Sequence, residues 1–256
     1  MLNSIATRIA GSRRGRYWTN RIGNSPAFQP LFDIMANRLH AGLRTLAELG
    51  FAPAVIVDIG AYRGHWTRTA RRYFPQARFL MVEPQLDKER DLARLRQTAP
   101  DRIEYALAVL GPEERASAPF HLAESGSSLY PDRTAFPHQT TTVPMRTLDR
   151  VAGAIEGTAF LKLDVQGAEM EVLAGGPDVL RRTDAIMLEA SVLEFNIGTP
   201  LIAEVIARMD GLGFQLFDIW DLRRIGPVLA QTDLLFVRQG SELLAHGQNA
   251  IDRYGT

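Results

Sequence analysis

The spacing of apolar residues along the chain predicts a long helix followed by alternating strands and helices. Between residues 28 and 49, large apolar side chains recur every three or four positions, as on one face of a helix, and Gly50 ends the pattern. Further on, short continuous apolar runs predict buried strands and amphipathic stretches predict helices. The predicted strands are 54–58, 78–83, 103–109, 159–164 and 185–189, and the predicted helices are 65–73, 85–98, 168–174 and 201–212.

This order of elements predicts a doubly wound α/β fold. Strands and helices that alternate with short connections are typical of a parallel sheet with right-handed crossovers. Residues 213–219 and 233–237 predict an antiparallel pair that completes the sheet. Residues 111–145 interrupt the alternation with short strands at 117–122 and 140–145 around a loop rich in Ser, Gly and Pro. We therefore expect an inserted hairpin and lid in this region.

The same pattern predicts one sheet domain with two flanking segments. We expect an N-terminal helical extension over residues 1–50, the sheet domain over residues 51–240 and a C-terminal tail over residues 241–256. The first of these segments carries several arginines but no apolar stretch after them, so it does not fit a secretory signal.

Composition narrows the possible function classes. The 256 residues are 46% hydrophobic and 23% charged, as in ordinary globular proteins. Basic and acidic residues balance at 29 each, which argues against nucleic acid as a partner. The absence of cysteine excludes disulfides, cysteine-bound zinc and iron–sulfur clusters. No apolar run approaches the roughly 18 residues of a membrane span, so we expect a soluble, cytoplasmic protein, with homo-oligomers left open.

Polar residues and glycines follow the first predicted strand. In an open parallel sheet, ligands bind beyond the carboxyl ends of the strands. The segment from Asp58 to Gly64 has the pattern Asp-x-Gly-x-x-x-Gly, in which the glycines let a ligand approach the backbone before a helix begins. An aspartate in this position also serves as an ordinary helix cap.

The next two strand ends add the groups that a nucleoside requires. Glu83, directly before Pro84, could accept hydrogen bonds from both hydroxyls of a ribose, and Ala108 could flank an adenine ring. The chain lacks the G-x-G-x-x-G loop that favours a pyrophosphate, and the charge of Asp58 suits an ammonium group. The pattern therefore favours S-adenosylmethionine over NAD. Taken alone, Glu83 could equally be a solvated turn carboxylate.

Several stretches together resemble the FkbM family of S-adenosylmethionine-dependent methyltransferases, over roughly residues 55–237. The resemblance implies a class I methyltransferase fold, which is Rossmann-like, and O-methylation of small molecules, often sugars or secondary metabolites. The matching stretches are Val57–Gly64 with Thr67, Val82–Pro84, Gly126–Leu129, Met145–Asp149, Phe160–Glu169 with Val172–Gly175, and Ile186–Glu189.

Two positions depart from the family pattern. Tyr62 stands where the family commonly has Asn, which bears on the pocket for the methionine part of the cofactor. Gln166 stands where the family frequently has Glu, so no catalytic carboxylate is expected at that position.

The strand-end positions and the resemblance together give a set of candidate site residues. Asp164, at the end of the fourth parallel strand, could bind the amine of the cofactor, orient the acceptor hydroxyl or remove its proton. Glu189 and His138 are further candidate catalytic residues. The candidate cofactor-binding residues are Asp58, Gly60, Ala61, Tyr62, Gly64, His65, Thr67, Glu83, Pro84, Ala108, Ser128, Asp164 and Gln166.

The expected reaction is methyl transfer to a hydroxyl of a glycoside or metabolite without a metal. In-line transfer needs the acceptor oxygen held roughly 3 to 3.5 Å from the methyl carbon, and a strong base is not obligatory. The stretch from Glu189 to Ser191 lacks the Asp-Asn pair of metal-dependent relatives, so we expect no metal site. The alternatives are N-methylation of a peptide or small amine and a non-catalytic nucleoside-binding scaffold. A nicotinamide dehydrogenase is least favoured.

Overall fold

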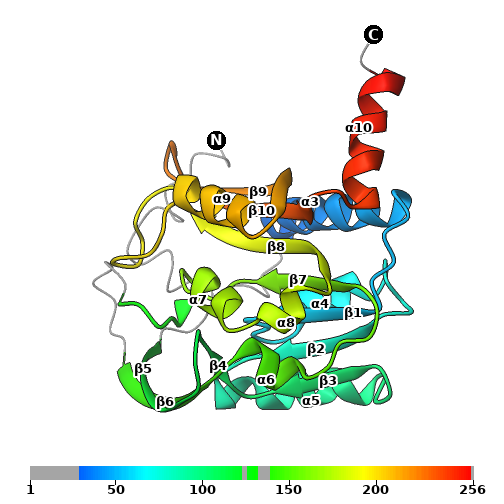
Figure 1. Ribbon diagram of the computed structural model, residues 1–256. Helices are drawn as coiled ribbons and strands as arrows, with labels where there is room; N and C mark the ends of the chain where they lie inside the picture. Colours follow the sequence, from blue (N-terminus) through cyan, green and yellow to red (C-terminus); the bar gives the residue numbers. More distant parts are fainter. Residues whose placement is uncertain (1–28, 123–125, 132–138, 255–256) are drawn as a thin grey trace.

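A seven-stranded sheet organises the part of the chain that the computed structural model describes, which is residues 29–122, 126–131 and 139–254 (Figure 1). The strand order is β3-β2-β1-β7-β8-β10-β9; the first five strands are parallel, and β10 and β9 complete the sheet as an antiparallel pair. The predicted fold class is confirmed. The strands are β1 (Val55–Ile59), β2 (Arg78–Val82), β3 (Ile103–Ala106), β7 (Ala159–Leu163), β8 (Thr183–Ser191), β9 (Phe214–Ile225) and β10 (Val228–Arg238).

Helices cover both faces of this sheet. Successive strand residues point to opposite sides, so the continuous apolar runs present apolar side chains on both faces. One face packs against α3 (Gln29–Glu48), α4 (His65–Ala70), α5 (Glu89–Gln97) and α10 (Glu242–Tyr254). The opposite face packs against α6 (Leu148–Ala152), α7 (Glu169–Ala174), α8 (Pro177–Leu180) and α9 (Ile202–Gly211). A short 3-10 helix, η1 (Leu86–Lys88), precedes α5.

The alternation in β1 and β7 shows how the two cores form. Ile56 and Phe160 are fully buried on the α3–α4–α5 face, and Val57 and Leu161 are fully buried on the opposite face. Asp58 and Lys162 follow the same alternation and therefore point to the α3–α4–α5 face. Two opposite charges thus lie within an otherwise apolar layer.

The insert forms a second, three-stranded sheet in the order β4-β6-β5 (Figure 1). Its strands are β4 (Val109–Leu110), β5 (Arg115–Leu122) and β6 (Gln139–Arg146), so the expected hairpin is present. The prediction of one continuous strand over residues 103–109 is wrong. The chain leaves the main sheet after Ala106, and Val109 pairs instead with Met145 of β6.

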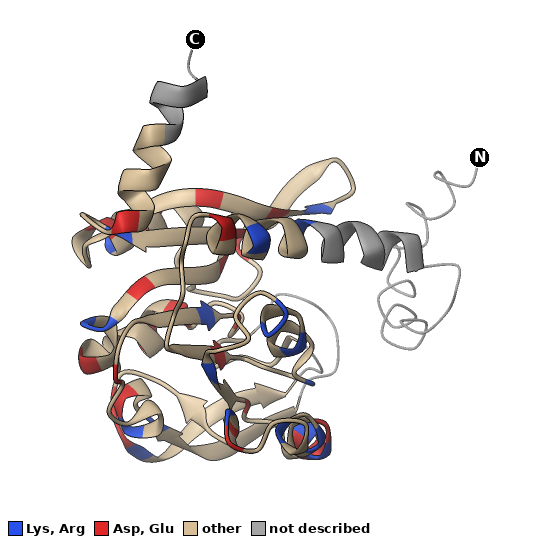
Figure 2. Ribbon diagram, turned by 90° about the vertical axis from the view of Figure 1, so that its right-hand side faces the viewer, with Lys and Arg blue, Asp and Glu red and all other residues tan. Residues whose placement is uncertain are grey.

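The segments before and after the sheet domain each contain a helix that packs against the core of the sheet. Leu43 and Leu46 of α3 are buried in the same core as the strands, and Gly42 leaves room for the ring of Trp220 in β9. The predicted C-terminal tail contains helix α10, which is anchored by Leu243 and projects from the sheet (Figures 1 and 2). None of the described helices is long and apolar enough to cross a membrane.

Candidate functional site

A cavity opens beyond the carboxyl ends of β1, β2 and β7, and the insert covers one side of it. Six of the predicted site residues line this cavity: Gly60, Tyr62, Glu83, Pro84, Ala108 and Asp164. The insert contributes Phe120, Ser127 and Leu129, and the remaining lining residues are Ile59, Val82, Gln85, Val109, Leu110, Val165 and Ala168. The cavity therefore combines an apolar wall with two carboxylates.

The loop after β1 lies directly against the loop after β7. The backbone N–H groups of Gly60 and Ala61 both donate to the carbonyl oxygen of Val82, at 2.9 and 3.0 Å. Gly60 has a φ of +74°, and a Cβ added there would overlap the carbonyl oxygen of Asp164. Only glycine satisfies both constraints, so the first predicted glycine is required for the close approach of the two loops.

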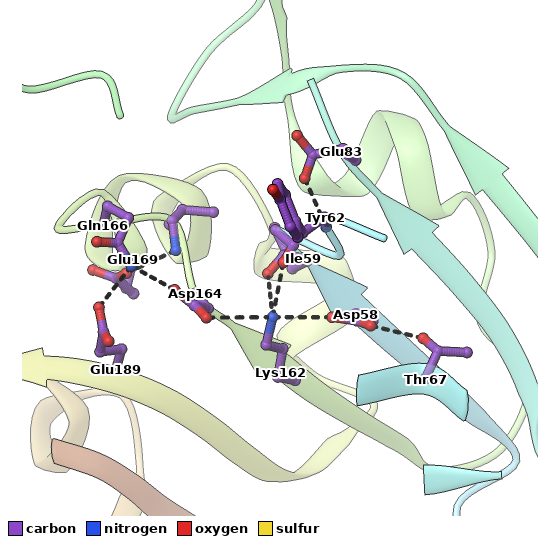
Figure 3. Close-up of polar contacts among 12 residues, drawn as sticks. Asp58, Ile59, Tyr62, Thr67, Glu83, Lys162, Asp164, Gln166, Glu169 and Glu189 are labelled. Carbon is purple, nitrogen blue, oxygen red and sulfur yellow. Dashed lines mark hydrogen bonds and ion pairs between the residues drawn. The ribbon is translucent and has the colours of Figure 1, made fainter. Parts of the chain in front are cut away.

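Glu83 is held in place by two backbone N–H groups. One carboxylate oxygen accepts a hydrogen bond from the amide of Tyr62 at 2.8 Å (Figure 3), and the other accepts one from the amide of Gln85 at 3.0 Å. The residue is 3% exposed. Burial raises the pKa of Glu83, and the two amide hydrogen bonds oppose that rise. The side chain of Gln85 also donates to this carboxylate. A carboxylate has about four acceptor sites, so capacity for a further hydrogen bond remains.

A buried ammonium group, that of Lys162, joins the two loops (Figure 3). Its Nζ lies 3.1 Å from Oδ1 of Asp58 and 3.8 Å from Oδ2 of Asp164. It also donates to the carbonyl oxygens of Ile59 at 3.4 Å and Gly60 at 2.9 Å. Burial lowers the pKa of Lys162, but the attraction of Asp58 and Asp164 outweighs this effect and the net shift is upward, so the group is charged.

Asp58 has a different position from the one expected. The sequence predicts that its carboxylate faces the ammonium of a cofactor, but the residue is fully buried and is not part of the cavity lining. One oxygen pairs with Lys162, and the other accepts a hydrogen bond from Thr67 Oγ1 at 2.7 Å. Asp58 and Thr67 therefore contribute to the site through Lys162 rather than by facing the cavity.

Gln166 joins two carboxylates on the side of β7 away from β1. Its Nε2 donates to Asp164 Oδ1 at 2.7 Å and to Glu189 Oε2 at 2.8 Å. The residue has a φ of +57°, and its carbonyl oxygen accepts hydrogen bonds from Ser128 Oγ and from the side chain of Asn196. The insert and the loop after β8 thus hold Gln166 in a strained backbone conformation.

Two residues of the β9–β10 hairpin, which the sequence pattern does not identify, complete the surroundings of Glu189. Arg223 Nη1 lies 3.0 Å from Glu189 Oε1, and Gln231 Nε2 donates to Oε2 at 2.9 Å. Burial and then the charge of Asp164 raise the pKa of Glu189. Burial, followed by the charge of Asp164, also raises the pKa of Asp233 to about 7. Asp233 stands opposite Glu189 in the strand pairing.

Glu169 stabilises the turn that contains Asp164 and Gln166. Its Oε1 accepts hydrogen bonds from the amides of Val165 at 3.0 Å and Gly167 at 3.2 Å. Burial raises the pKa of Glu169 to about 7, although these hydrogen bonds act in the opposite direction. The turn therefore depends on a buried carboxyl group that titrates near neutral pH.

The remaining predicted residues lie around the cavity rather than in its lining. Ala61 and Gly64 shape the loop before α4, and His65 is the first residue of that helix. Burial and then Arg68 lower the pKa of His65. His138 lies outside the described residues. Within the described ranges, no group of three or more His, Asp or Glu side chains is arranged to hold a metal ion, and metal independence stays a prediction.

The sequence places this site in a known family. The model of the methyltransferase FkbM domain matches residues 58–216, more than half of the chain. The chain belongs to the FkbM family of S-adenosylmethionine-dependent methyltransferases. The match covers the loop after β1, Glu83, the Lys162–Glu169 segment and Glu189. A search of curated proteins gives no match.

Solved structures give the fold of this FkbM family member but not its substrate. A methyltransferase FkbM from Methylobacillus flagellatus KT is 16% identical, with 73% of this chain and 44% of that protein covered and a TM-score of 0.47. The chain thus spans less than half of that protein. Magnesium protoporphyrin IX methyltransferase (ChlM) from Synechocystis PCC 6803, solved with bound SAH, is 10% identical, with 93% and 100% covered and a TM-score of 0.51.

Loss of the Lys162 ammonium should destabilise the protein through Asp58. We expect Lys162→Met to lower the free energy of unfolding by about 3 to 5 kcal/mol, because the carboxylate of Asp58 would be left buried without its cation. The double variant Asp58→Asn/Lys162→Met should be more stable than Lys162→Met alone, since no buried charge remains. Urea unfolding measures both. Additive losses in the double variant would contradict the pairing.

Glu169 should make stability depend on pH. Its folded pKa of about 7 lies above the ordinary value of 4.5, so the proton favours the folded state and stability falls as pH rises from 4.5 through 7. Glutamine keeps the acceptor oxygen and does not titrate. Glu169→Gln should therefore match the wild type near about pH 5 and exceed it by on the order of 3 kcal/mol near about pH 8.

The exposed substitution Glu156→Gln is the matched control for this comparison. It should leave the free energy of unfolding unchanged at both pH values. A Glu169→Gln variant whose stability runs parallel to that of the wild type across the whole pH range would refute the assignment of a buried titrating group.

Proposed function

We propose that this methyltransferase transfers the methyl group of S-adenosylmethionine to a hydroxyl group of a small molecule, either a glycoside or a secondary metabolite, without a metal. The observation that carries the proposal is the bridge formed by Gln166, whose amide holds the carboxylates of Asp164 and Glu189 beside the cavity. A carboxylate held in this way at the cavity, as Asp164 is, can accept a hydrogen bond from an acceptor hydroxyl and take its proton.

The cavity has the groups that the cofactor requires. The carboxylate of Glu83 lines the cavity and keeps capacity to accept a hydrogen bond from a ribose hydroxyl, and Ala108 and Leu110 offer an apolar wall for the adenine. Glycine at position 60 allows the loop after β1 to pack against the loop after β7, where a Cβ would overlap the carbonyl oxygen of Asp164. When bound, S-adenosylmethionine supplies an electrophilic methyl group, whose bond to sulfur breaks as the bond to the acceptor oxygen forms.

The two carboxylates differ in exposure to the cavity, and this difference supports different roles for them. The side chain of Asp164 is 40% exposed and lines the cavity, while that of Glu189 is 5% exposed and lies behind Gln166. Asp164 accepts the proton of the acceptor hydroxyl. Glu189 acts through Gln166 as a positioning residue, and Arg223 balances its charge.

The test is transfer of labelled methyl groups to a panel of hydroxyl acceptors and to matched amines. Asp164→Asn should lower kcat by about a hundredfold or more, the usual size of a proton-transfer contribution, and should change the affinity for S-adenosylhomocysteine much less. Chelation by EDTA should leave the rate unchanged. The control Asp178→Asn, at an exposed position of α8 that does not line the cavity, should behave like the wild type.

Two results would overturn the proposal. Label that appears only on amines would establish N-methylation instead. An Asp164→Asn variant with wild-type kcat on its best hydroxyl acceptor would remove Asp164 from the reaction.

A further inference from the structure

A second hollow, lined mostly by arginine, lies at the opposite end of the parallel strands from the methyl-transfer site. It has a volume of about 250 Å³ and is lined by Arg68, Arg71, Arg72, Pro75, Ala77, Phe79 and Arg102. We call it the arginine hollow. Ala77 stands directly before β2 and Arg102 directly before β3, so it lies where these strands begin, whereas the cofactor cavity lies where they end. The beginning of these strands is at the right of Figure 1 and faces the viewer in Figure 2.

The spacing of the arginines brings their charges together. Arg71 and Arg72 lie three and four residues after Arg68, in the turn that follows α4, and this spacing places both beside Arg68. Arg102 reaches the same hollow from the connection between α5 and β3. The segment from residue 63 to residue 72 contains no acidic residue.

Within the described part of the chain, these guanidinium groups have no carboxylate partner. Among the described residues, no Asp or Glu oxygen lies within the 4.0 Å of an ion pair from any of the four, although Arg96, Arg181 and Arg208 elsewhere are each paired. Two of the four are held by neutral acceptors. Arg71 Nη1 donates to Thr98 Oγ1 at 2.7 Å, and Arg102 donates to the carbonyl and side-chain oxygens of Gln76.

Four positive charges that are partly fixed in position and not paired with carboxylates repel one another. An anion bound between them would therefore be stabilised more than an anion bound at a single surface arginine. A single carboxylate carries too little charge for four guanidinium groups, whereas phosphate groups match the geometry of arginine and carry up to two charges each. We propose that the arginine hollow binds the diphosphate group of a small molecule, at a site separate from the methyl-transfer site.

Calorimetric titration of the full chain with inorganic pyrophosphate, at constant ionic strength, tests this proposal. The wild type should bind one equivalent, and Arg68→Gln/Arg72→Gln should bind at least about tenfold more weakly, since each charge-assisted contact contributes about that factor. The matched control is Arg181→Gln/Arg208→Gln, which changes the net charge equally at exposed, paired arginines and should bind like the wild type.

Two further measurements distinguish specific binding in the hollow from a loss of folding and from binding in the cofactor cavity. The Arg68→Gln/Arg72→Gln variant should be at least as stable as the wild type without anions, because repulsion is relieved, and pyrophosphate should raise the Tm of the wild type alone. If the double variant does not fold, the exposed single variant Arg72→Gln replaces it. Both variants should keep the wild-type response to S-adenosylhomocysteine.

The proposal fails if pyrophosphate binds the wild type and Arg68→Gln/Arg72→Gln equally, or binds neither. It also fails if pyrophosphate gives no heat while vesicles containing phosphatidylglycerol retain the wild type and not the double variant, because the hollow would then contact a membrane surface. Binding that S-adenosylhomocysteine abolishes would place the pyrophosphate in the cofactor cavity and would equally overturn it.

Discussion

The ion pair between Lys162 and Asp58 is the interaction on which the rest of the site depends. It lies within a buried apolar layer, where two charges lose their hydration and where well-packed apolar residues would hold the strands as well or better. The ion pair therefore serves to position the strand ends rather than to stabilise the fold. The same ammonium donates to the carbonyl oxygens of Ile59 and Gly60 and faces Asp164, so one charge fixes the ends of β1 and β7 relative to each other.

The two parts of the candidate site lie on either side of this ion pair. On one side, the loop that Lys162 holds presents the amide of Tyr62 to Glu83, and the glycine at position 60 lets this loop pack against the carbonyl oxygen of Asp164. On the other side, the turn after β7 carries Asp164 and Gln166, and a buried carboxyl group, Glu169, accepts two amide hydrogen bonds across it. The proposed function puts cofactor and acceptor on opposite sides of this strand end.

The sequence predicts the parts of this arrangement that depend on local pattern. Continuous apolar runs identified the parallel strands, and the polar residues at their ends, Glu83 and Asp164, do line the cavity. The position of Asp58 differs from the expected one because a pattern of residue types does not show that a lysine lies beside it on the neighbouring strand. Arg223 and Gln231 were missed for a similar reason, since they reach Glu189 only through a long antiparallel hairpin whose strands mix polar and apolar residues.

The central claim is that the Lys162 junction positions the cofactor loop and does not merely stabilise the fold. The most direct measurement is the calorimetric affinity of S-adenosylhomocysteine for the wild type and for folded Asp58→Asn/Lys162→Met protein. We predict one bound equivalent for the wild type and an affinity lower by at least about tenfold for the variant, because the carbonyl oxygens of the loop lose their shared donor. Equal affinity of the two proteins, or no binding by the wild type, would contradict the account.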